Sequence, residues 1–260
     1  MRALLATLLA LALPALAAAE PPRVGIVTPN APPGTPLREL GYQLYAGNCA
    51  ECHGTAGAGV APSQSANGTG DIHAAGPPLR GVGARAADFY LRTGYMPLAR
   101  ADVQPRRSRV LFTPREVDAL VAYVGSLGHG PPVPRPHPER GDVAAGLSLF
   151  TDHCAGCHQV AARGGYLPGA VAPPLDEATP TQVAEAVRIG PYLMPLFSTR
   201  AISDRQLDSI VAYVEYAKRP QDPGGLAIGR IGPVPEGLIA WFVGGAALVG
   251  CCVMIGKKAR

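Results

Sequence analysis

Apolar residues in the first half of the chain recur with the spacing of an amphipathic helix. Leu40, Leu44 and Tyr45 stand at positions i, i+4 and i+5. This pattern predicts a helix over residues 37–52, because such positions share one face of a helix. A shorter helix is expected over residues 87–92.

A further helix in this half is predicted by its start signals. In Thr113-Pro114-Arg115-Glu116, the threonine suits the cap position and the proline suits the first helical position. The glutamate follows three residues after the threonine, as in a capping box. We expect this helix to end near Gly128.

The second half of the chain repeats the pattern of the first half, which indicates two copies of one unit. The matching segments are Gly41-Tyr42-Gln43-Leu44-Tyr45 and Gly146-Leu147-Ser148-Leu149-Phe150, Pro77-Pro78-Leu79 and Pro173-Pro174-Leu175, and Val-Ala-Tyr-Val at 121–124 and 211–214. A closing helix over residues 203–218 corresponds to the one that begins at Thr113. We therefore predict two tandem all-α modules, each with an opening helix that crosses a closing helix.

Proline-rich stretches separate these modules from each other and from both ends of the chain. The stretch at 130–138 reads as a stiff polyproline II spacer. The expected organisation is a signal peptide at 1–19, a linker at 20–36, module 1 at 37–129, the spacer at 130–138, module 2 at 139–219, a linker at 220–236, a transmembrane helix at 237–256 and a cytoplasmic tail at 257–260.

The two ends of the chain carry the targeting signals. The N-terminus has an arginine, an apolar run and small residues at Ala15-Leu16-Ala17, which is typical of a secretory signal; an uncleaved anchor helix is the alternative. Residues 237–256 contain no charge and are long enough to span a bilayer, although a buried soluble helix would share this pattern. Because Lys257 and Lys258 follow at once, we expect the C-terminus inside and both modules outside.

Composition narrows the function classes. Charged residues make up 16% of the chain and the formal net charge is +4, which is too weak to indicate a nucleic-acid partner. Of six cysteines, four fall into two short motifs, and Cys251 and Cys252 lie in the apolar C-terminal run.

The two motifs are Cys49-Ala50-Glu51-Cys52-His53 and Cys154-Ala155-Gly156-Cys157-His158. Each has the C-x-x-C-H spacing that attaches c-type haem, in which two thiols add to the porphyrin vinyl groups and the histidine provides the proximal nitrogen. Half a zinc site, a redox dithiol or a disulfide loop would also use C-x-x-C. None of these needs a histidine directly after both motifs, so we predict two covalently bound haem c groups in two tandem cytochrome c domains.

The distal ligands are predicted from the few methionines. Met96-Pro97 and Met194-Pro195 occupy matching places in the two modules, and the other methionines are the initiator and one in the apolar run. We therefore expect His53 with Met96, and His158 with Met194, as axial ligands, a pair that raises the haem potential and suits electron transfer. His73 is the rival ligand in module 1.

Two further groups of residues have candidate roles around the haems. The carbonyls of Pro77 and Pro173 are expected to orient the two haem histidines, although these prolines could simply turn the chain. Four arginines after Met96 either pair with haem propionates, dock an acidic partner, or form a solvated loop; they are Arg100, Arg106, Arg107 and Arg109.

Four segments together suggest a family. They are Gly76-Pro77-Pro78-Leu79 with Gly81-Val82-Gly83, Thr93-Gly94-Tyr95-Met96-Pro97, Gly190-Pro191-Tyr192-Leu193-Met194-Pro195, and Gly232-Pro233-Val234-Pro235-Glu236-Gly237 before Trp241 and the terminal span. From about residue 37 to residue 260, the chain resembles the dihaem cytochrome c subunit of the actinobacterial cytochrome bcc complex, a menaquinol–cytochrome c reductase.

This resemblance implies a set of partners. A cytochrome b subunit would oxidise quinol, a Rieske iron–sulfur subunit would pass electrons to the two haems, and an aa-type terminal oxidase would accept them. The subunit would act as a membrane-anchored electron carrier within a reductase, with no catalytic site of its own. A cytochrome c subunit of a terminal oxidase and a dihaem peroxidase remain as alternatives, and the matched methionines disfavour the peroxidase.

Overall fold

The computed structural model describes residues 25–61, 75–98, 104–219 and 233–258. The chain divides into two compact units, the first ending at Val214 and the second beginning at Glu215. The first unit holds most of both predicted modules. The predicted signal peptide at 1–19 lies outside the described residues, as do parts of the linkers at 20–36 and 220–236.

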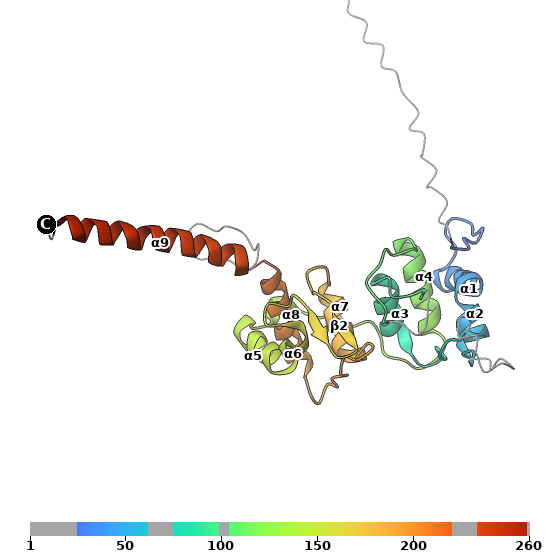
Figure 1. Ribbon diagram of the computed structural model, residues 1–260. Coiled ribbons are helices and arrows are strands. Elements are labelled where there is room, and N and C mark those ends of the chain that lie inside the picture. The colour runs from blue at the N-terminus through green and yellow to red at the C-terminus, as the bar shows by residue number, and fades with distance from the viewer. Residues whose placement is uncertain (1–24, 62–74, 99–103, 220–232, 259–260) are drawn as a thin grey trace, which may run out of the picture. The chain divides into compact units, whose positions relative to one another are not determined.

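Module 1 is helical (Figure 1). Its elements are α1 (Leu37–Asn48), α2 (Ala50–His53), a 3-10 turn η1 (Thr55–Gly57), α3 (Gly83–Arg92) and α4 (Pro114–Gly125). Helix α4 packs against both α1 and α3. The threonine cap predicted for α4 is confirmed, because Thr113 and Glu116 form a reciprocal capping box.

Module 2 repeats this order with a small addition. Its elements are a 3-10 turn η2 (Pro138–Arg140), α5 (Val143–His153), α6 (Ala155–His158), β1 (Gly165–Leu167), β2 (Ala170–Ala172), α7 (Pro180–Ile189) and α8 (Asp204–Lys218). The strands form an antiparallel hairpin in which Tyr166 pairs with Val171. The prediction of two tandem helical domains is confirmed, and the hairpin is the departure from it within module 2.

The opening and closing helices of each module cross at a glycine. A Cβ atom on Gly41 would collide with the carbonyl oxygen of Ala119 in α4, and one on Gly146 would collide with the carbonyl oxygen of Ser209 in α8. The side chains beyond the crossing form the core, where Leu44 and Leu120 of module 1 are almost fully buried. The repeated glycines are therefore required by the close approach of two helix backbones.

The structure corrects two helix boundaries. Residues 37–52 form two helices, because the backbone of Cys49 leaves helical geometry and the side chain of Asn48 bonds the Leu44 carbonyl at 2.8 Å. Such local side-chain bonds compete with helix continuation. Helix α3 begins at Gly83, earlier than the predicted residue 87, and the N–H of Arg85 in its added turn donates to the Pro131 carbonyl at 3.1 Å.

Helix α7 was absent from the sequence-based prediction. It begins with a second capping box, formed by Thr179 and Gln182 around Pro180. These are the same signals that predicted α4. The helix could therefore have been found from Thr179-Pro180-Thr181-Gln182 alone.

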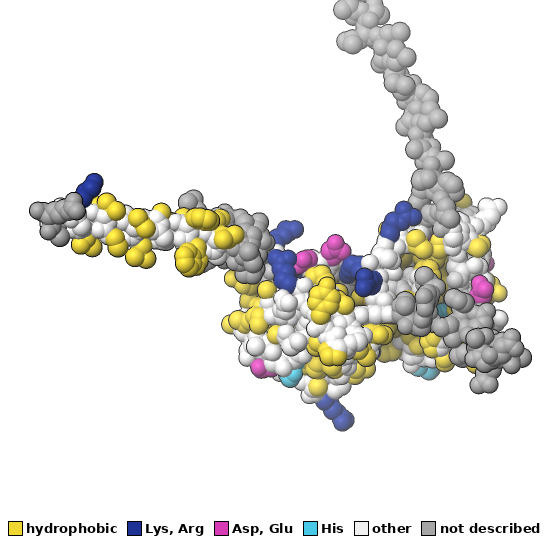
Figure 2. All heavy atoms as spheres, in the orientation of Figure 1, with side chains coloured by type: hydrophobic (Ala, Val, Ile, Leu, Met, Phe, Trp, Pro, Cys, Tyr) yellow, Lys and Arg dark blue, Asp and Glu magenta, His cyan; other side chains and the backbone are white. Residues whose placement is uncertain are grey.

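The second unit consists largely of α9 (Pro233–Lys258). Its stretch Gly237–Lys258, which contains an 18-residue window with a mean hydropathy of 2.3, is the candidate membrane span among the described residues. Trp241 and Phe242 are 82% and 75% exposed, and Figure 2 shows further hydrophobic side chains along α9. A helix that displays so much apolar surface fits a lipid environment, which supports the predicted C-terminal span.

Candidate haem sites

Each C-x-x-C-H motif forms one helical turn. In module 1 the N–H of His53 donates to the carbonyl of Cys49 at 2.9 Å, and in module 2 the N–H of His158 donates to that of Cys154 at 2.9 Å. This turn brings the two cysteines and the histidine of each motif close together. Among the described residues, no three or more His, Cys, Asp or Glu side chains form a group with metal-site geometry.

Both haem histidines face a proline carbonyl. Nδ1 of His53 lies 2.8 Å from the carbonyl oxygen of Pro77, and Nδ1 of His158 lies 3.0 Å from that of Pro173. A carbonyl only accepts hydrogen bonds, so Nδ1 carries the proton and Nε2 keeps its lone pair. This is the tautomer in which Nε2 can ligate iron.

Burial controls the protonation of the site. Burial lowers the pKa of His158, and the bond to the Pro173 carbonyl opposes this shift. The imidazole is thereby favoured in its neutral, ligating form. Burial also raises the pKa of the Cys49 thiol to about 12 and that of the Cys154 thiol to about 11, which favours the neutral thiol over the thiolate.

A cavity in module 2 gathers the predicted haem-binding groups. Cys154, Cys157, His158 and Met194 all line it, together with the apolar side chains Leu175, Val183, Val187 and Ile210. Two thiols, an imidazole and a thioether inside apolar walls suit a covalently bound, largely apolar porphyrin. The residues present therefore fit haem c.

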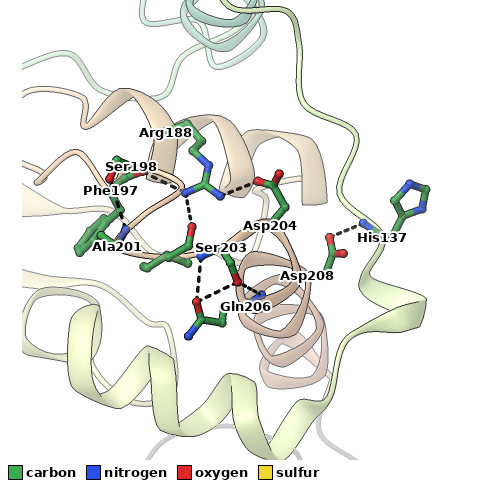
Figure 3. Close-up of polar contacts among 10 residues, drawn as sticks. His137, Arg188, Phe197, Ser198, Ala201, Ser203, Asp204, Gln206 and Asp208 are labelled. Atoms are coloured by element: carbon green, nitrogen blue, oxygen red, sulfur yellow. Dashed lines mark hydrogen bonds and ion pairs between the residues drawn. The ribbon is translucent and has the colours of Figure 1, made fainter.

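A buried arginine holds the loop that carries Met194 (Figure 3). Arg188 of α7 is 6% exposed, and its Nη1 donates to the carbonyls of Phe197 at 3.1 Å and Ile202 at 2.8 Å. Its Nη2 pairs with Asp204 at the start of α8 at 2.7 Å. Arg188 thus ties the part of the loop that follows Met194 to α7 and to the start of α8.

In module 1, Met96 follows α3 on an anchored segment. The N–H of Met96 donates to the carbonyl of Tyr90 at 3.0 Å, and the N–H of Ser108 donates to that of Thr93 at 3.2 Å. The pairing of Met96 with His53 stays a prediction. His73 and Arg100 lie outside the described residues.

The module 2 cavity also contains residues that the sequence analysis did not assign to it. They come from module 1 and are Phe89, Thr93, Tyr95, Gln104, Pro105 and Arg107. No spacing within module 1 indicates this role, because it arises only from the packing of α3 against α7. Of the predicted arginines, Arg107 lines the cavity and Arg106 and Arg109 do not, although all three are exposed to solvent.

The repeated helical fold and its paired motifs define a c-type cytochrome with two covalently bound haems. Comparisons with known families agree. The cytochrome c family model matches residues 39–128, and the model of cbb3-type cytochrome c oxidase subunit III matches residues 141–214.

Relatives of known identity define the family more closely. The cytochrome bc1 complex cytochrome c subunit of Mycobacterium tuberculosis is 37% identical over 232 residues, which cover 85% of this chain and 78% of that protein. The subunit of the same name from Corynebacterium diphtheriae is 33% identical over 259 residues, covering 90% and 88%. The chain belongs to the family of cytochrome bc1 complex cytochrome c subunits, and the predicted resemblance is confirmed.

A more distant relative matches part of the chain. The cbb3-type cytochrome c oxidase subunit FixP of Sinorhizobium medicae is 27% identical over 135 residues, covering 50% of this chain and 42% of that protein. This similarity and the family model for residues 141–214 show that the haem-domain type is shared with oxidase subunits.

Proposed function

We propose that this chain conducts electrons from the Rieske iron–sulfur subunit of a quinol-oxidising complex to an aa-type terminal oxidase. A cytochrome b subunit would be the site of quinol oxidation. The observation that carries the proposal is the cavity in which Cys154, Cys157, His158 and Met194 meet, in a chain whose family is named for a cytochrome bc1 complex.

The axial ligands in this proposal are His53 with Met96 and His158 with Met194. When bound, each haem iron cycles between ferric and ferrous states and so accepts and releases one electron. His53 and His158, oriented by the carbonyls of Pro77 and Pro173, would each give iron one nitrogen ligand. Met96 and Met194 would each give a thioether as the second protein ligand, and an iron with two protein ligands would have no position for oxygen or peroxide, which favours electron transfer over catalysis.

We place both haem modules on the outer side of the membrane and the C-terminus in the cytoplasm. Lys257 and Lys258 at the end of α9 support this orientation, because positive residues are retained inside. The anchor would then keep the modules close to the outer faces of both membrane complexes, so that a freely diffusing cytochrome is not required.

The ligand assignment is tested with methionine variants. Met96→Ala and Met194→Ala should each reduce the weak red-end absorption of methionine-ligated ferric haem by about half, because one of two such haems loses its thioether. Haem content should stay at two per chain. Met254→Ala, in α9, is the matched control and should leave the band unchanged. An unaltered band in either test variant would remove that methionine from the ligand set.

The partner assignment is tested by purification. A tagged chain, extracted from its native membrane in mild detergent, should bring down a cytochrome b subunit, a Rieske subunit and an aa-type oxidase. Quinol added to this preparation should reduce both haems.

The alternative is a haem subunit of a terminal oxidase, favoured by the oxidase family model over residues 141–214. In that case the chain would purify with oxidase subunits alone, and added quinol would leave its haems oxidised. This outcome would overturn the proposed route.

A further inference from the structure

Module 1 and module 2 are joined by directed polar contacts beside the haem cavity. The side-chain amide of Gln104 bonds the backbone of Val171 twice, accepting from its N–H at 2.9 Å and donating to its carbonyl at 2.8 Å. Gln182 of α7 donates to the carbonyl of Arg92 at the end of α3 at 3.2 Å. These bonds hold Gln104 against the hairpin and the end of α3 against α7 of module 2.

Three further residues of module 1 reach the module 2 cavity. Phe89, Tyr95 and Arg107 line the same space as His158 and Met194. The ring of Phe89 is 4% exposed and meets the ring of Tyr95 edge-on, with their centroids 5.6 Å apart. One wall of the cavity is therefore an aromatic pair that belongs to the other module.

Tyr95 occupies a particular place in the chain. It is bonded through its own peptide to Met96, the proposed iron ligand of module 1, while its side chain lines the cavity of module 2. The ring lies within electrostatic range of the Arg107 guanidinium.

Arg107 is a cation at the edge of the cavity. Its Nη2 donates to Oε1 of Gln182 at 2.7 Å, and its Nε lies 4.0 Å from Glu177. Its side chain is 33% exposed, so it lies between solvent and the cavity interior. The guanidinium has further donors, and its planar fork matches a carboxylate. Haem carries two carboxylates on one edge.

We propose that module 1 completes the haem site of module 2, with the Tyr95 ring packed against that haem as the bridge between the two haem sites and Arg107 paired with one of its carboxylates. This inference rests on the proposed axial ligands. It goes beyond them, because it assigns two residues of one module to the cofactor of the other.

The assignment has two physical consequences. A cation beside a haem favours the reduced iron, which carries one positive charge less, so Arg107 raises the potential of the module 2 haem. The Tyr95–Met96 peptide provides a short route of bonded atoms from one haem site to the other, so the Tyr95 ring speeds electron exchange between them.

Equilibrium redox titration of the purified full-length protein tests Arg107. Its absorbance change is expected to resolve into two one-electron steps. Met194→His identifies the module 2 step, because exchange of thioether for imidazole lowers that haem's potential. Arg107→Gln should lower the equilibrium constant for reduction of the module 2 haem about tenfold, which lowers its potential by about 59 mV for one electron. Arg106→Gln removes the same charge from the neighbouring exposed position and should move neither step.

The outcomes separate this proposal from the ligand assignment. If Met194→His moves a step but Arg107→Gln moves neither step, or moves both equally, Arg107 is not a partner of the module 2 haem. If Met194→His itself moves no step, the assignment of Met194 as axial ligand is wrong instead. Haem-selective magnetic resonance then identifies which of the two haems has the altered potential in Arg107→Gln.

Interhaem electron exchange tests Tyr95. After rapid photoreduction of the oxidised protein, Tyr95→Leu should slow equilibration between the haems several-fold, whereas Tyr95→Phe keeps the ring and should retain the rate. Tyr166→Leu changes a tyrosine that is 92% exposed on the module 2 hairpin and serves as the control. Equal rates in Tyr95→Leu and the unmodified protein, with both haems bound, would overturn the bridging role.

Discussion

A buried carboxyl group between the two modules makes stability depend on pH. Glu185 of α7 is 0% exposed, and neither of its carboxyl oxygens has a hydrogen-bond partner among the described residues. Asp88 of α3 faces it, together with Arg92 and Arg85 of the same helix. Two carboxylates offer each other only acceptors, so a bond between Glu185 and Asp88 forms only when one carries a proton.

The size of the effect follows from the proton affinity. Burial, then the charge and hydrogen bond of Asp88, raise the pKa of Glu185 from 4.5 to about 9, with Arg92 and Arg85 opposing the shift. Between these values the folded protein keeps a proton that the unfolded chain has lost, so the free energy of unfolding falls as pH rises. At pH 7 this loss reaches about 3 kcal/mol relative to pH 4.5, because each pH unit corresponds to about 1.36 kcal/mol.

The variant Glu185→Gln isolates the contribution of this carboxyl group to the pH dependence of stability. Its amide stays neutral and can donate to Asp88, so the stability of the variant relative to the unmodified protein should increase by up to about 5 kcal/mol between pH 5 and pH 9. Denaturant titration of the detergent-solubilised holoprotein, followed by circular dichroism, measures the difference. Glu39→Gln alters an exposed glutamate of α1 and should give a pH-independent difference. A pH-independent difference for Glu185→Gln as well would refute the reasoning.

Three further predictions concern the methionine loop, the helix crossing and the anchor. Arg188→Met should lower the free energy of unfolding by about 2–4 kcal/mol and weaken the red-end absorption band, because two loop carbonyls lose their donor. Arg200→Met, at an exposed position, is the control, and an equal loss of stability in both variants would contradict the role of Arg188. Gly146→Ala should cost about 1–3 kcal/mol in denaturant titrations, because its Cβ collides with α8, whereas Gly156→Ala meets nothing within 4 Å and should cost little. Protease added to wall-free cells should digest the haem modules, and their protection would reverse the proposed topology.

The sequence by itself determined the parts of this protein that depend on local spacing. Two C-x-x-C-H motifs predict covalent haem, because one helical turn suffices to set the sulfurs and the histidine. The capping residues of α4 and the uncharged run in α9 likewise act within their own helices. The resemblance to the family also rests on short contiguous segments.

Only the tertiary structure decided which distant residues meet. Gly41 is required because the carbonyl of Ala119 approaches it, and no local pattern encodes that distance. Likewise, Glu185 is buried because α3 packs against α7, and a helix period does not distinguish burial against a second module from exposure. Tyr95 and Arg107 entered the cavity of the other module for the same reason: contacts between modules depend on the summed packing of surfaces that lie far apart in the chain.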